Sequence, residues 1–165
     1  MGSISLIGMP ASGKSTVGVV LAKTACRNFI DTDLLIQEAS GCSLQEIIDR
    51  SGMDVFLEAE KAAICSVFDE QAVIATGGSA VYIHAAMEHL SKLSDIIYLK
   101  WELPVLLERL GNIKTRGVAM APGFSLEDLY RERTPLYERY ADRIIECDGL
   151  SVEEIIEKIL SVRGR

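Results

Sequence analysis

The residues with the clearest chemical capacity lie near the start of the chain, where residues 8–16 read G-M-P-A-S-G-K-S-T. This run follows the pattern G-x-x-x-x-G-K-[ST], in which backbone N–H groups surround phosphates, the lysine neutralises the outer phosphates and the hydroxyl coordinates Mg²⁺. The pattern predicts a nucleoside triphosphate site. The residues expected to bind the nucleotide here are Gly8, Ala11, Ser12, Gly13, Lys14, Ser15 and Thr16.

Two carboxylates are the next candidates for chemistry. Asp31 and Asp33 follow the apolar run at 28–30, whereas the runs at 72–75 and 95–99 continue into Thr76 and Lys100 and offer no acid to a metal. Because ligands of open parallel sheets gather at the carboxyl ends of the strands, the two acids are expected beside the phosphate-binding loop, one toward Mg²⁺ and one toward an acceptor hydroxyl. The alternative is that they only cap the following helix.

Alternating strands and helices must position these groups. Five apolar runs, at 4–7, 28–30, 72–75, 95–99 and 143–146, are separated by helical stretches, which predicts an α/β fold with a parallel sheet covered on both faces. Helix starts are marked by Ser43 with Glu46, Ser151 with Glu154, and a Ser125 to Asp128 variant of the capping box. The glycine-rich, basic stretch of about residues 111–124 suggests a mobile lid.

Composition restricts the class of protein. A chain of 165 residues with 48% hydrophobic content predicts a single domain, and a net charge of −7 argues against a nucleic-acid partner. The four cysteines form no C-x-x-C pair, so reduced and mostly packed thiols are expected. No apolar segment or basic leader points to a membrane, and we therefore expect a cytoplasmic protein. The lack of an obvious apolar seam favours a monomer.

Several motifs in order along the chain resemble the shikimate kinase family over nearly the whole sequence. They are G-M-P-A-S-G-K-S-T, F-I-D-T-D, S-L-Q-E-I-I, V-I-A-T-G-G and R-T-P-L-Y-E-R-Y-A-D. The resemblance implies a three-layer αβα P-loop kinase fold in one domain, residues 1–165, with sheet order 2-3-1-4-5, a lid and an acceptor-binding helical region at about 33–60. It also implies transfer of the γ-phosphoryl group of Mg-ATP to the 3-hydroxyl of shikimate.

The resemblance also implies roles for individual residues. Lys14 and Ser15 would hold phosphate and metal, Asp31 would support Mg²⁺ through water, and Asp33 would bind acceptor hydroxyls and act as the base. The remaining roles concern binding: Gly77 and Gly78 would offer N–H groups to the acceptor, Arg133 would pair with its carboxylate, Arg109 would stack near adenine, and Arg116 in the lid would reach the phosphates as a catalytic group.

Three positions depart from the family pattern. The family motif F-R-x-x-E is here F-L-E-A-E, with Leu57 where the family has an arginine that grips the acceptor carboxylate together with the arginine matched by Arg133, and Glu60 loses its expected partner. The family's third glycine is Ser79, which puts a hydroxyl where the backbone approaches the ligand, and the lid sequence R-P-L-L is R-G-V-A from Arg116. The nucleotide side therefore matches the family while the acceptor side is altered.

Two alternatives stay open beside shikimate phosphorylation. One is a related kinase, similar to gluconate kinases, that phosphorylates a different polyol or hydroxy acid without the missing arginine. The other is a nucleotide-binding regulator without catalysis, against which Asp33 and Arg133 argue because such a protein has no use for acceptor-side groups. His84 and His89 are spaced poorly for a metal, and Trp101 is expected to serve packing.

Overall fold

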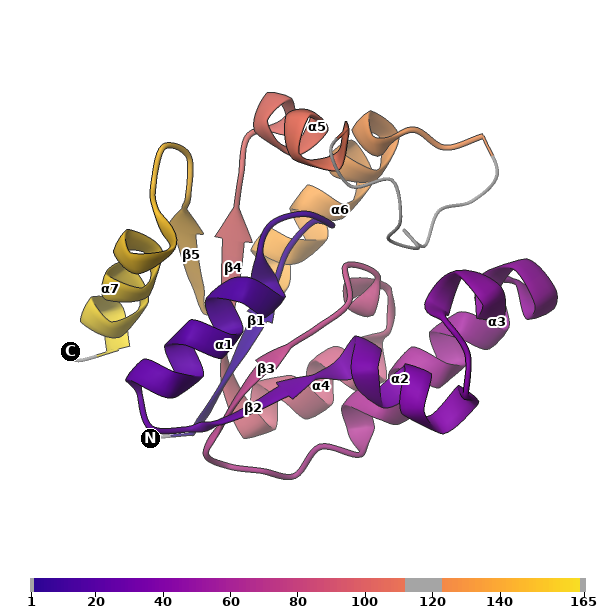
Figure 1. Ribbon diagram of the computed structural model, residues 1–165, viewed down its shortest axis with the longest axis horizontal. Coiled ribbons are helices and arrows are strands. Elements are labelled where there is room, and N and C mark those ends of the chain that lie inside the picture. Colours follow the sequence, from indigo (N-terminus) through magenta and orange to yellow (C-terminus); the bar gives the residue numbers. More distant parts are fainter. Residues whose placement is uncertain (1, 112–122, 164–165) are drawn as a thin grey trace.

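The protein is an α/β molecule built on a five-stranded parallel sheet, as the computed structural model in Figure 1 shows for residues 2–111 and 123–163. The strand order is β2-β3-β1-β4-β5, which confirms the predicted order. The central strands are buried along their whole length because helices cover both faces, which is why they read as continuous apolar runs. The strands are β1 (Ser3–Ile7), β2 (Asn28–Asp31), β3 (Ala72–Ala75), β4 (Ser94–Lys100) and β5 (Arg143–Glu146).

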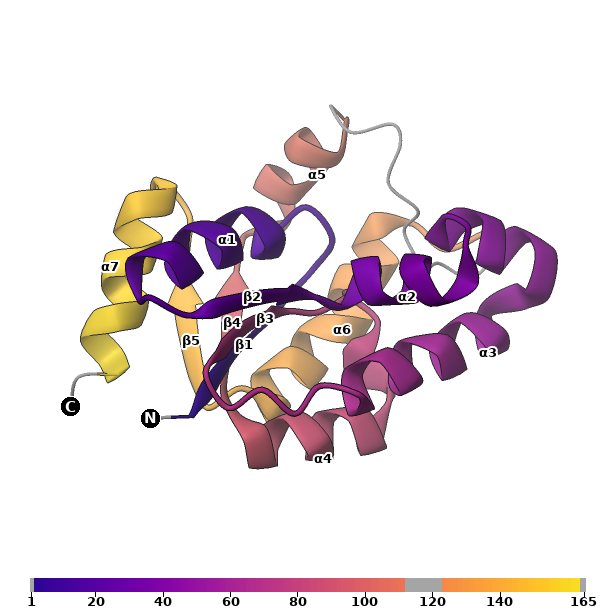
Figure 2. The same ribbon diagram turned by 60° about the horizontal axis from the view of Figure 1, so that its bottom comes forward.

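Helices form the two outer layers. Helices α1 and α7 pack on one face of the sheet, and α4 and α6 pack on the other (Figure 2). Helices α2 and α3 extend beyond the carboxyl end of β2 and contact each other. The bounds are α1 (Lys14–Thr24), α2 (Thr32–Ser40), α3 (Leu44–Cys65), a 3₁₀ turn η1 (Ala80–Tyr82), α4 (His84–Leu93), α5 (Leu103–Gly111), α6 (Leu126–Tyr140) and α7 (Val152–Arg163).

The predicted capping boxes are confirmed at three helix starts. In α3 the Ser43 hydroxyl accepts from the Glu46 backbone N–H while the Glu46 carboxylate accepts from the Ser43 backbone N–H. The same reciprocal pairs form between Ser125 and Asp128 at α6 and between residues 151 and 154 at α7. Each box satisfies backbone N–H groups that have no partner within the helix, so the start of each helix is fixed by its own sequence.

Helix α3 consists of two segments joined at Gly52, whose backbone is non-helical with φ 83° and ψ 172°. The second segment runs back toward the sheet and carries Phe56, which joins Ile36 of α2, Ile47 and Ala63 in a small apolar cluster. This cluster is separate from the main core around the sheet. It fixes α3 against α2 and so sets one wall of the space beyond β2.

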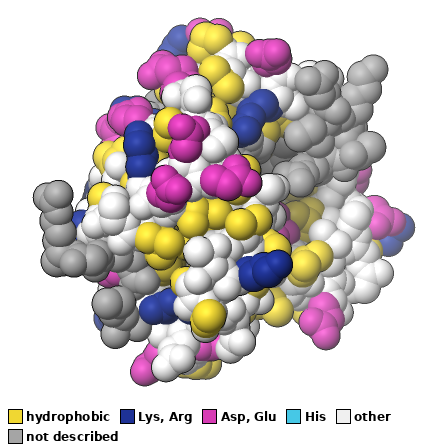
Figure 3. All heavy atoms as spheres, turned by 60° about the vertical axis from the view of Figure 1, so that its left-hand side comes forward, with side chains coloured by type: hydrophobic (Ala, Val, Ile, Leu, Met, Phe, Trp, Pro, Cys, Tyr) yellow, Lys and Arg dark blue, Asp and Glu magenta, His cyan; other side chains and the backbone are white. Residues whose placement is uncertain are grey.

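The surface charge, the helix lengths and the cysteines also bear on the sequence-based expectations. On the face in Figure 3, lysine and arginine side chains are scattered among acidic ones rather than gathered in one patch. Within residues 2–111 and 123–163, no helix has the length and apolar character needed to cross a membrane. All four cysteines are free thiols, as expected. Cys147 is buried, Cys42 and Cys65 are half-buried, and Cys26 is exposed.

Candidate active site

The loop between β1 and α1 has the geometry of a phosphate-binding loop. Gly13 stands at the start of α1 with φ 84°, a left-handed conformation that glycine adopts without the penalty of a Cβ atom. Ala11 also has a positive φ of 65°, a strained value for a residue with a side chain. The start of α1 therefore directs its unpaired N–H groups and positive dipole end into the loop, where an anion would be stabilised.

Lys14 lies folded back over this loop. Its Nζ donates to the carbonyl oxygens of Gly8 (2.8 Å) and Met9 (2.9 Å) and to the Ser12 hydroxyl (3.3 Å). The side chain is buried, so these oxygens replace water around the ammonium group. The positive charge is thereby held at the position where the pattern predicts the outer phosphates.

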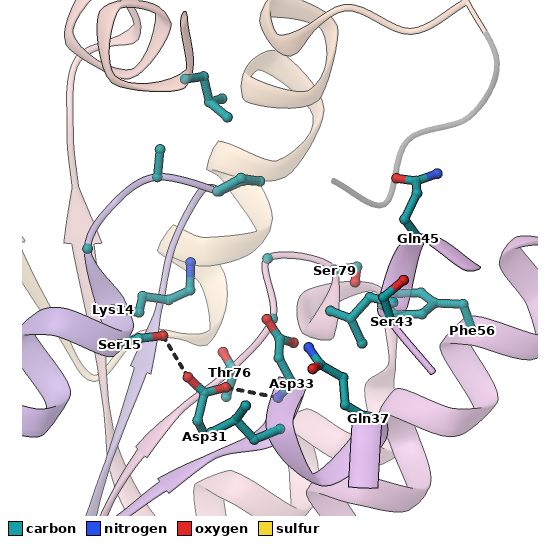
Figure 4. Close-up of a pocket in the computed structure, with 18 of the residues that line it drawn as sticks. Lys14, Ser15, Asp31, Asp33, Gln37, Ser43, Gln45, Phe56, Thr76 and Ser79 are labelled. Atoms are coloured by element: carbon teal, nitrogen blue, oxygen red, sulfur yellow. Dashed lines mark hydrogen bonds between the residues drawn. The ribbon is translucent and has the colours of Figure 1, made fainter. Parts of the chain in front are cut away.

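Ser15 and Asp31 form the pair expected at a magnesium site (Figure 4). The Ser15 hydroxyl donates to Asp31 Oδ2 at 2.7 Å, and Asp31 Oδ1 accepts from the Asp33 backbone N–H at 3.0 Å. Asp31 therefore caps α2 and also faces the loop, so the capping and metal interpretations are compatible. A hydroxyl and a carboxylate are hard oxygen ligands of the kind Mg²⁺ prefers, so these residues fit the ion.

Trp101 supports the loop from the side of β4. Its indole Nε1–H donates to the Ser12 carbonyl at 2.9 Å, and the Arg109 guanidinium lies 4.0 Å from the centre of its ring. Arg109 also donates to the Ala11 carbonyl at 3.1 Å. Trp101 is buried as expected, and in addition it holds two carbonyls of the loop in place directly and through the arginine.

The acceptor side is built around Arg133 on α6, which is buried. Its Nε donates to the Tyr82 hydroxyl at 3.1 Å, and its guanidinium lies 5.1 Å from the centre of the Tyr82 ring. Tyr137, one turn later on α6, donates from its hydroxyl to the Gly78 carbonyl at 2.6 Å. These contacts fix α6 to the loop after β3 and hold the arginine in one direction.

Glu60 lies behind this part of the wall with no exposed surface. Its Oε2 accepts from the Ser79 hydroxyl at 2.5 Å, and its Oε1 is close to Gly77 and Asp33. Burial is the largest cause that raises the pKa of Glu60, and the nearby Asp33 carboxylate acts in the same direction. The Ser79 hydrogen bond, Arg133 and Lys14 oppose them, and the net pKa is about 7. A Cβ on Gly77 would stand 2.3 Å from Glu60 Oε1, so the close approach requires glycine there.

A cavity of about 420 Å³ joins the two sides. It runs from the phosphate-binding loop to Arg133 and is bounded by the starts of α2 and α3 and by the loop after β3. The polar and apolar residues that line it include Lys14, Ser15, Asp31, Asp33, Gln37, Ser43, Gln45, Phe56, Thr76, Gly77, Gly78, Ser79 and Arg133. A nucleotide phosphate and a small hydroxylated molecule could therefore meet in one space.

A model of one family matches nearly the whole chain: the shikimate kinase model covers residues 10–163. This chain belongs to the shikimate kinase family. A shikimate kinase of Caldanaerobacter subterraneus subsp. tengcongensis is 36% identical over 163 residues, which are 97% of this chain and 95% of that protein. A shikimate kinase of Sulfurihydrogenibium sp. is 33% identical over 162 residues, 98% of this chain and 97% of that one.

Solved structures of the shikimate kinase family share the fold. Shikimate kinase from Acinetobacter baumannii, in complex with shikimate, superposes with a TM-score of 0.91 at 29% identity over 99% of this chain and 93% of that one. Shikimate kinase from Aquifex aeolicus superposes with a TM-score of 0.78 at 29% identity over 98% and 96% of the two chains. The α/β architecture, the family and the class of enzyme, an ATP-dependent kinase acting on an alcohol, agree with the sequence-based expectations.

The structure of this shikimate kinase family member gathers most of the predicted site residues at one cavity. Gly13, Lys14, Ser15 and Ala11 lie at one end, and Asp33, Gly77, Gly78 and Arg133 at the other. Arg109 lies beside the loop, against Ala11. Arg116, most of the predicted lid and its departure from R-P-L-L lie outside the described residues. The single-domain division, with its lid and acceptor region, stays a prediction.

The two acceptor-side departures adopt different environments. Leu57 packs with the apolar cluster of α2 and α3, next to Phe56, and is not among the cavity residues. Ser79 has an ordinary helical backbone, with φ −87° and ψ −6°. Its hydroxyl is directed to Glu60, so it takes a hydrogen-bonding role that the sequence did not indicate.

Several cavity residues were not predicted individually from the sequence, among them Gln37, Ser43, Gln45 and Phe56, although these four fall within the predicted acceptor region of about 33–60. Ser43 is the N-cap of α3 and Gln45 lies in its first turn, and the capping box of Ser43 and Glu46 indicated only the start of a helix there. The motif S-L-Q-E-I-I indicates the start of a helix. It does not indicate that this start faces the cavity, which depends on the turn that the chain makes at Gly41, after the end of α2. His84 and His89 contact Tyr140 and the Val67 carbonyl, and within the described residues no cluster of metal-binding side chains occurs.

Proposed function

We propose that this chain transfers the γ-phosphoryl group of ATP to the 3-hydroxyl of shikimate. One observation carries the proposal: Lys14 and Ser15, the groups for phosphate and metal, share a single cavity with Asp33 and Arg133, the groups for a hydroxylated carboxylic acid. Family membership gives independent support, and a relative of the same fold holds shikimate.

The nucleotide side would act by position and charge. Backbone N–H groups at the start of α1 would bind the phosphates, while Lys14 would exchange its loop carbonyls for outer phosphate oxygens. Ser15 would hold Mg²⁺ directly and Asp31 through water, and Mg²⁺ bound there would neutralise charge on the β- and γ-phosphates. Arg109 would stay beside the loop near the base of the nucleotide, and Arg116 would reach the phosphates.

The acceptor side would orient the nucleophile. Arg133 would bind the acceptor carboxylate, and the Gly77 and Gly78 backbone would fix the ring. Asp33 would accept the hydroxyl proton as the acceptor oxygen forms its bond to the γ-phosphorus and the bond from the γ-phosphorus to the bridging oxygen breaks, which leaves ADP. Restricting both reactants to one cavity contributes through proximity and orientation.

A coupled ADP-release assay with Mg-ATP tests the proposal. Shikimate is compared with quinate, gluconate, glycerate and homoserine, and saturable turnover with shikimate is expected. The variant Arg133→Lys keeps a positive charge but loses the paired N–H donors, so the shikimate KM should rise by about tenfold to a hundredfold while the ATP KM changes little. No turnover with shikimate together with turnover of another acceptor would refute the proposal.

One observation favours a second acceptor class. Gln37, Ser43 and Gln45 give the part of the cavity wall formed by α2 and the start of α3 neutral hydrogen-bonding groups, and Leu57, which does not line the cavity, brings no cation to it. Such a wall suits the hydroxyls of a polyol or hydroxy acid as well as a ring acid. Turnover of gluconate or glycerate at a higher kcat/KM than shikimate would support this second candidate.

A further inference from the structure

Glu60 is a buried carboxyl group to which the proposed phosphoryl transfer gives no task. It has no exposed surface and lies behind the cavity wall formed by Gly77 and Ser79. One oxygen, Oε2, accepts from the Ser79 hydroxyl, while Oε1 is buried and makes no hydrogen bond to the described residues. An ionised carboxylate that is shut off from bulk solvent and has one hydroxyl donor is costly, so the neutral acid is the favoured form.

The charges around Glu60 do not remove this cost. Asp33 of α2 faces it with a like charge, while Arg133 of α6 and Lys14 of α1 face it with opposite charges. Burial outweighs these effects and raises the pKa of Glu60 to about 7. On its own helix the nearest charges, Glu58 and Lys61, form an exposed pair with each other.

Position 57 could have supplied a cation to Glu60, because it lies three residues earlier on the same helix. It is occupied by Leu57, which packs in the apolar cluster of α2 and α3. Ser79 therefore supplies the hydrogen bond to Glu60 from a different element, the turn after β3. The hydroxyl satisfies one carboxyl oxygen without adding charge.

Glu60 and Asp33 also share one small region. A Cβ on Gly77 would stand 2.3 Å from Glu60 Oε1 and 3.0 Å from Asp33 Oδ1. The like charge of the nearby Asp33 carboxylate adds to the effect of burial and favours the neutral form of Glu60. A neutral Glu60 therefore places no second negative charge beside Asp33.

We infer that Ser79 and a protonated Glu60 form a neutral hydrogen-bonded pair beside the acceptor pocket, and that both are positioning residues for an anionic acceptor bound by Arg133. The inference rests on the proposed function, because it requires an acceptor with a carboxylate. Loss of the proton adds a negative charge near Asp33 and Arg133, which repels the acceptor and weakens its binding.

The inference makes acceptor binding depend on pH with a defined sign. Below pH about 7 Glu60 is neutral and the acceptor KM is constant; above it the acceptor KM rises as Glu60 ionises. The pair acts on the acceptor, so the ATP KM does not follow the same curve. Because the Ser79 hydrogen bond lowers the pKa of Glu60, its removal moves the rise to higher pH.

The experiment measures the shikimate KM between about pH 6 and about pH 8.5 for the native protein, Glu60→Gln and Ser79→Ala. The shikimate KM of the native protein should rise by roughly tenfold over this range, and that of Glu60→Gln by less than about twofold. For Ser79→Ala the shikimate KM should also rise, but with its midpoint at higher pH. ATP itself titrates with pH, and this affects the native protein and Glu60→Gln equally. Glu60→Gln is therefore the matched control. Parallel curves for the native protein and Glu60→Gln would overturn the inference.

A second measurement separates this inference from the proposed function. Titration of ¹³C-labelled glutamate carboxyl groups by NMR in the ligand-free protein should show one group near pH 7 that Glu60→Gln lacks. That result supports the neutral pair even if shikimate is not phosphorylated. A Glu60 carboxyl that titrates at its ordinary value of 4.5 overturns the inference even if shikimate turnover is normal.

Discussion

The two ends of the cavity are built in different ways. The nucleotide end is built mainly on one continuous loop, residues 8–15, with its backbone groups and Lys14, to which Asp31 and Arg109 are added from other elements. The acceptor end is assembled from α2, α3, the turn after β3 and α6, through Asp33, Glu60, Ser79 and Arg133. A backbone site tolerates side-chain change because the main chain stays constant, whereas a site of side chains from four elements changes with any one of them.

The largest expected effect removes the charge from the nucleotide end. Lys14→Ala should lower kcat/KM by about a thousandfold or more, because the lysine stabilises charge on the transferred phosphoryl group. The fold should persist, since the side chain contacts loop oxygens and not the apolar core. Steady-state kinetics and thermal unfolding measure the two quantities. Lys61→Ala, on an exposed pair, is the control, and unfolding of Lys14→Ala would show that the lysine is structural.

The next effect breaks the acceptor end where it is most tightly packed. Gly77→Ala places a Cβ 2.3 Å from Glu60 Oε1, and the buried carboxyl has little room to move. A loss of about 1–3 kcal/mol in the free energy of unfolding is expected, with a raised acceptor KM. Urea denaturation and kinetics test it. Gly111→Ala, with open space at its Cβ, should change stability little, and equal losses at both positions would contradict the packing argument.

The third expected effect is a pH dependence of stability that Glu60 gives to the acceptor end. The folded pKa of Glu60, about 7, exceeds its ordinary value of 4.5, so the native state binds more protons than the unfolded state between those values. Its contribution to stability is complete below about pH 4.5 and is lost as the pH rises through about 7, by on the order of 3 kcal/mol. Urea denaturation should show that the free energy of unfolding of Glu60→Gln increases relative to that of the native protein as the pH rises from about 4.5 to about 7. Glu58→Gln, on the surface, should run parallel to the native curve.

The smallest effect restores a cation to the acceptor end. Leu57→Arg should raise kcat/KM for shikimate by roughly tenfold, because a charge-assisted hydrogen bond to the acceptor carboxylate is gained and the long side chain can extend out of the apolar cluster. The same change should lower the pKa of Glu60. Val55→Arg, at an exposed position of α3, is the control. A flat or lower kcat/KM would mean that the pocket is organised around Leu57.

Sequence reasoning predicted the features that consecutive residues encode. The five strands, the phosphate-binding loop and the caps at Ser43, Ser125 and Ser151 each depend on a short run of residues, and the structure confirms them. The pairing of Ser15 with Asp31 also follows, because Ser15 begins α1 just beyond the carboxyl end of β1, Asp31 ends β2, and the carboxyl ends of the parallel strands lie at one edge of the sheet.

The remainder depends on contacts between distant segments. Trp101 reaches the Ser12 carbonyl across 89 residues of sequence, and Ser79 reaches Glu60 across 19. No local pattern encodes either contact, because each needs the folded sheet to bring its partners into reach. The roles of the individual site residues in binding and catalysis stay predictions.

The enclosure of Lys14 by its own loop has a consequence for how nucleotide binding is driven. Two carbonyl oxygens and a hydroxyl already accept hydrogen bonds from the ammonium group, so under the proposed role a phosphate would replace these oxygens rather than meet a bare charge. The Coulomb attraction is partly offset by the three bonds that are broken. Discrimination then comes from geometry: an anion must reach the lysine and the N–H groups of α1 together, and a stray phosphate or carboxylate that reaches the lysine alone gains little.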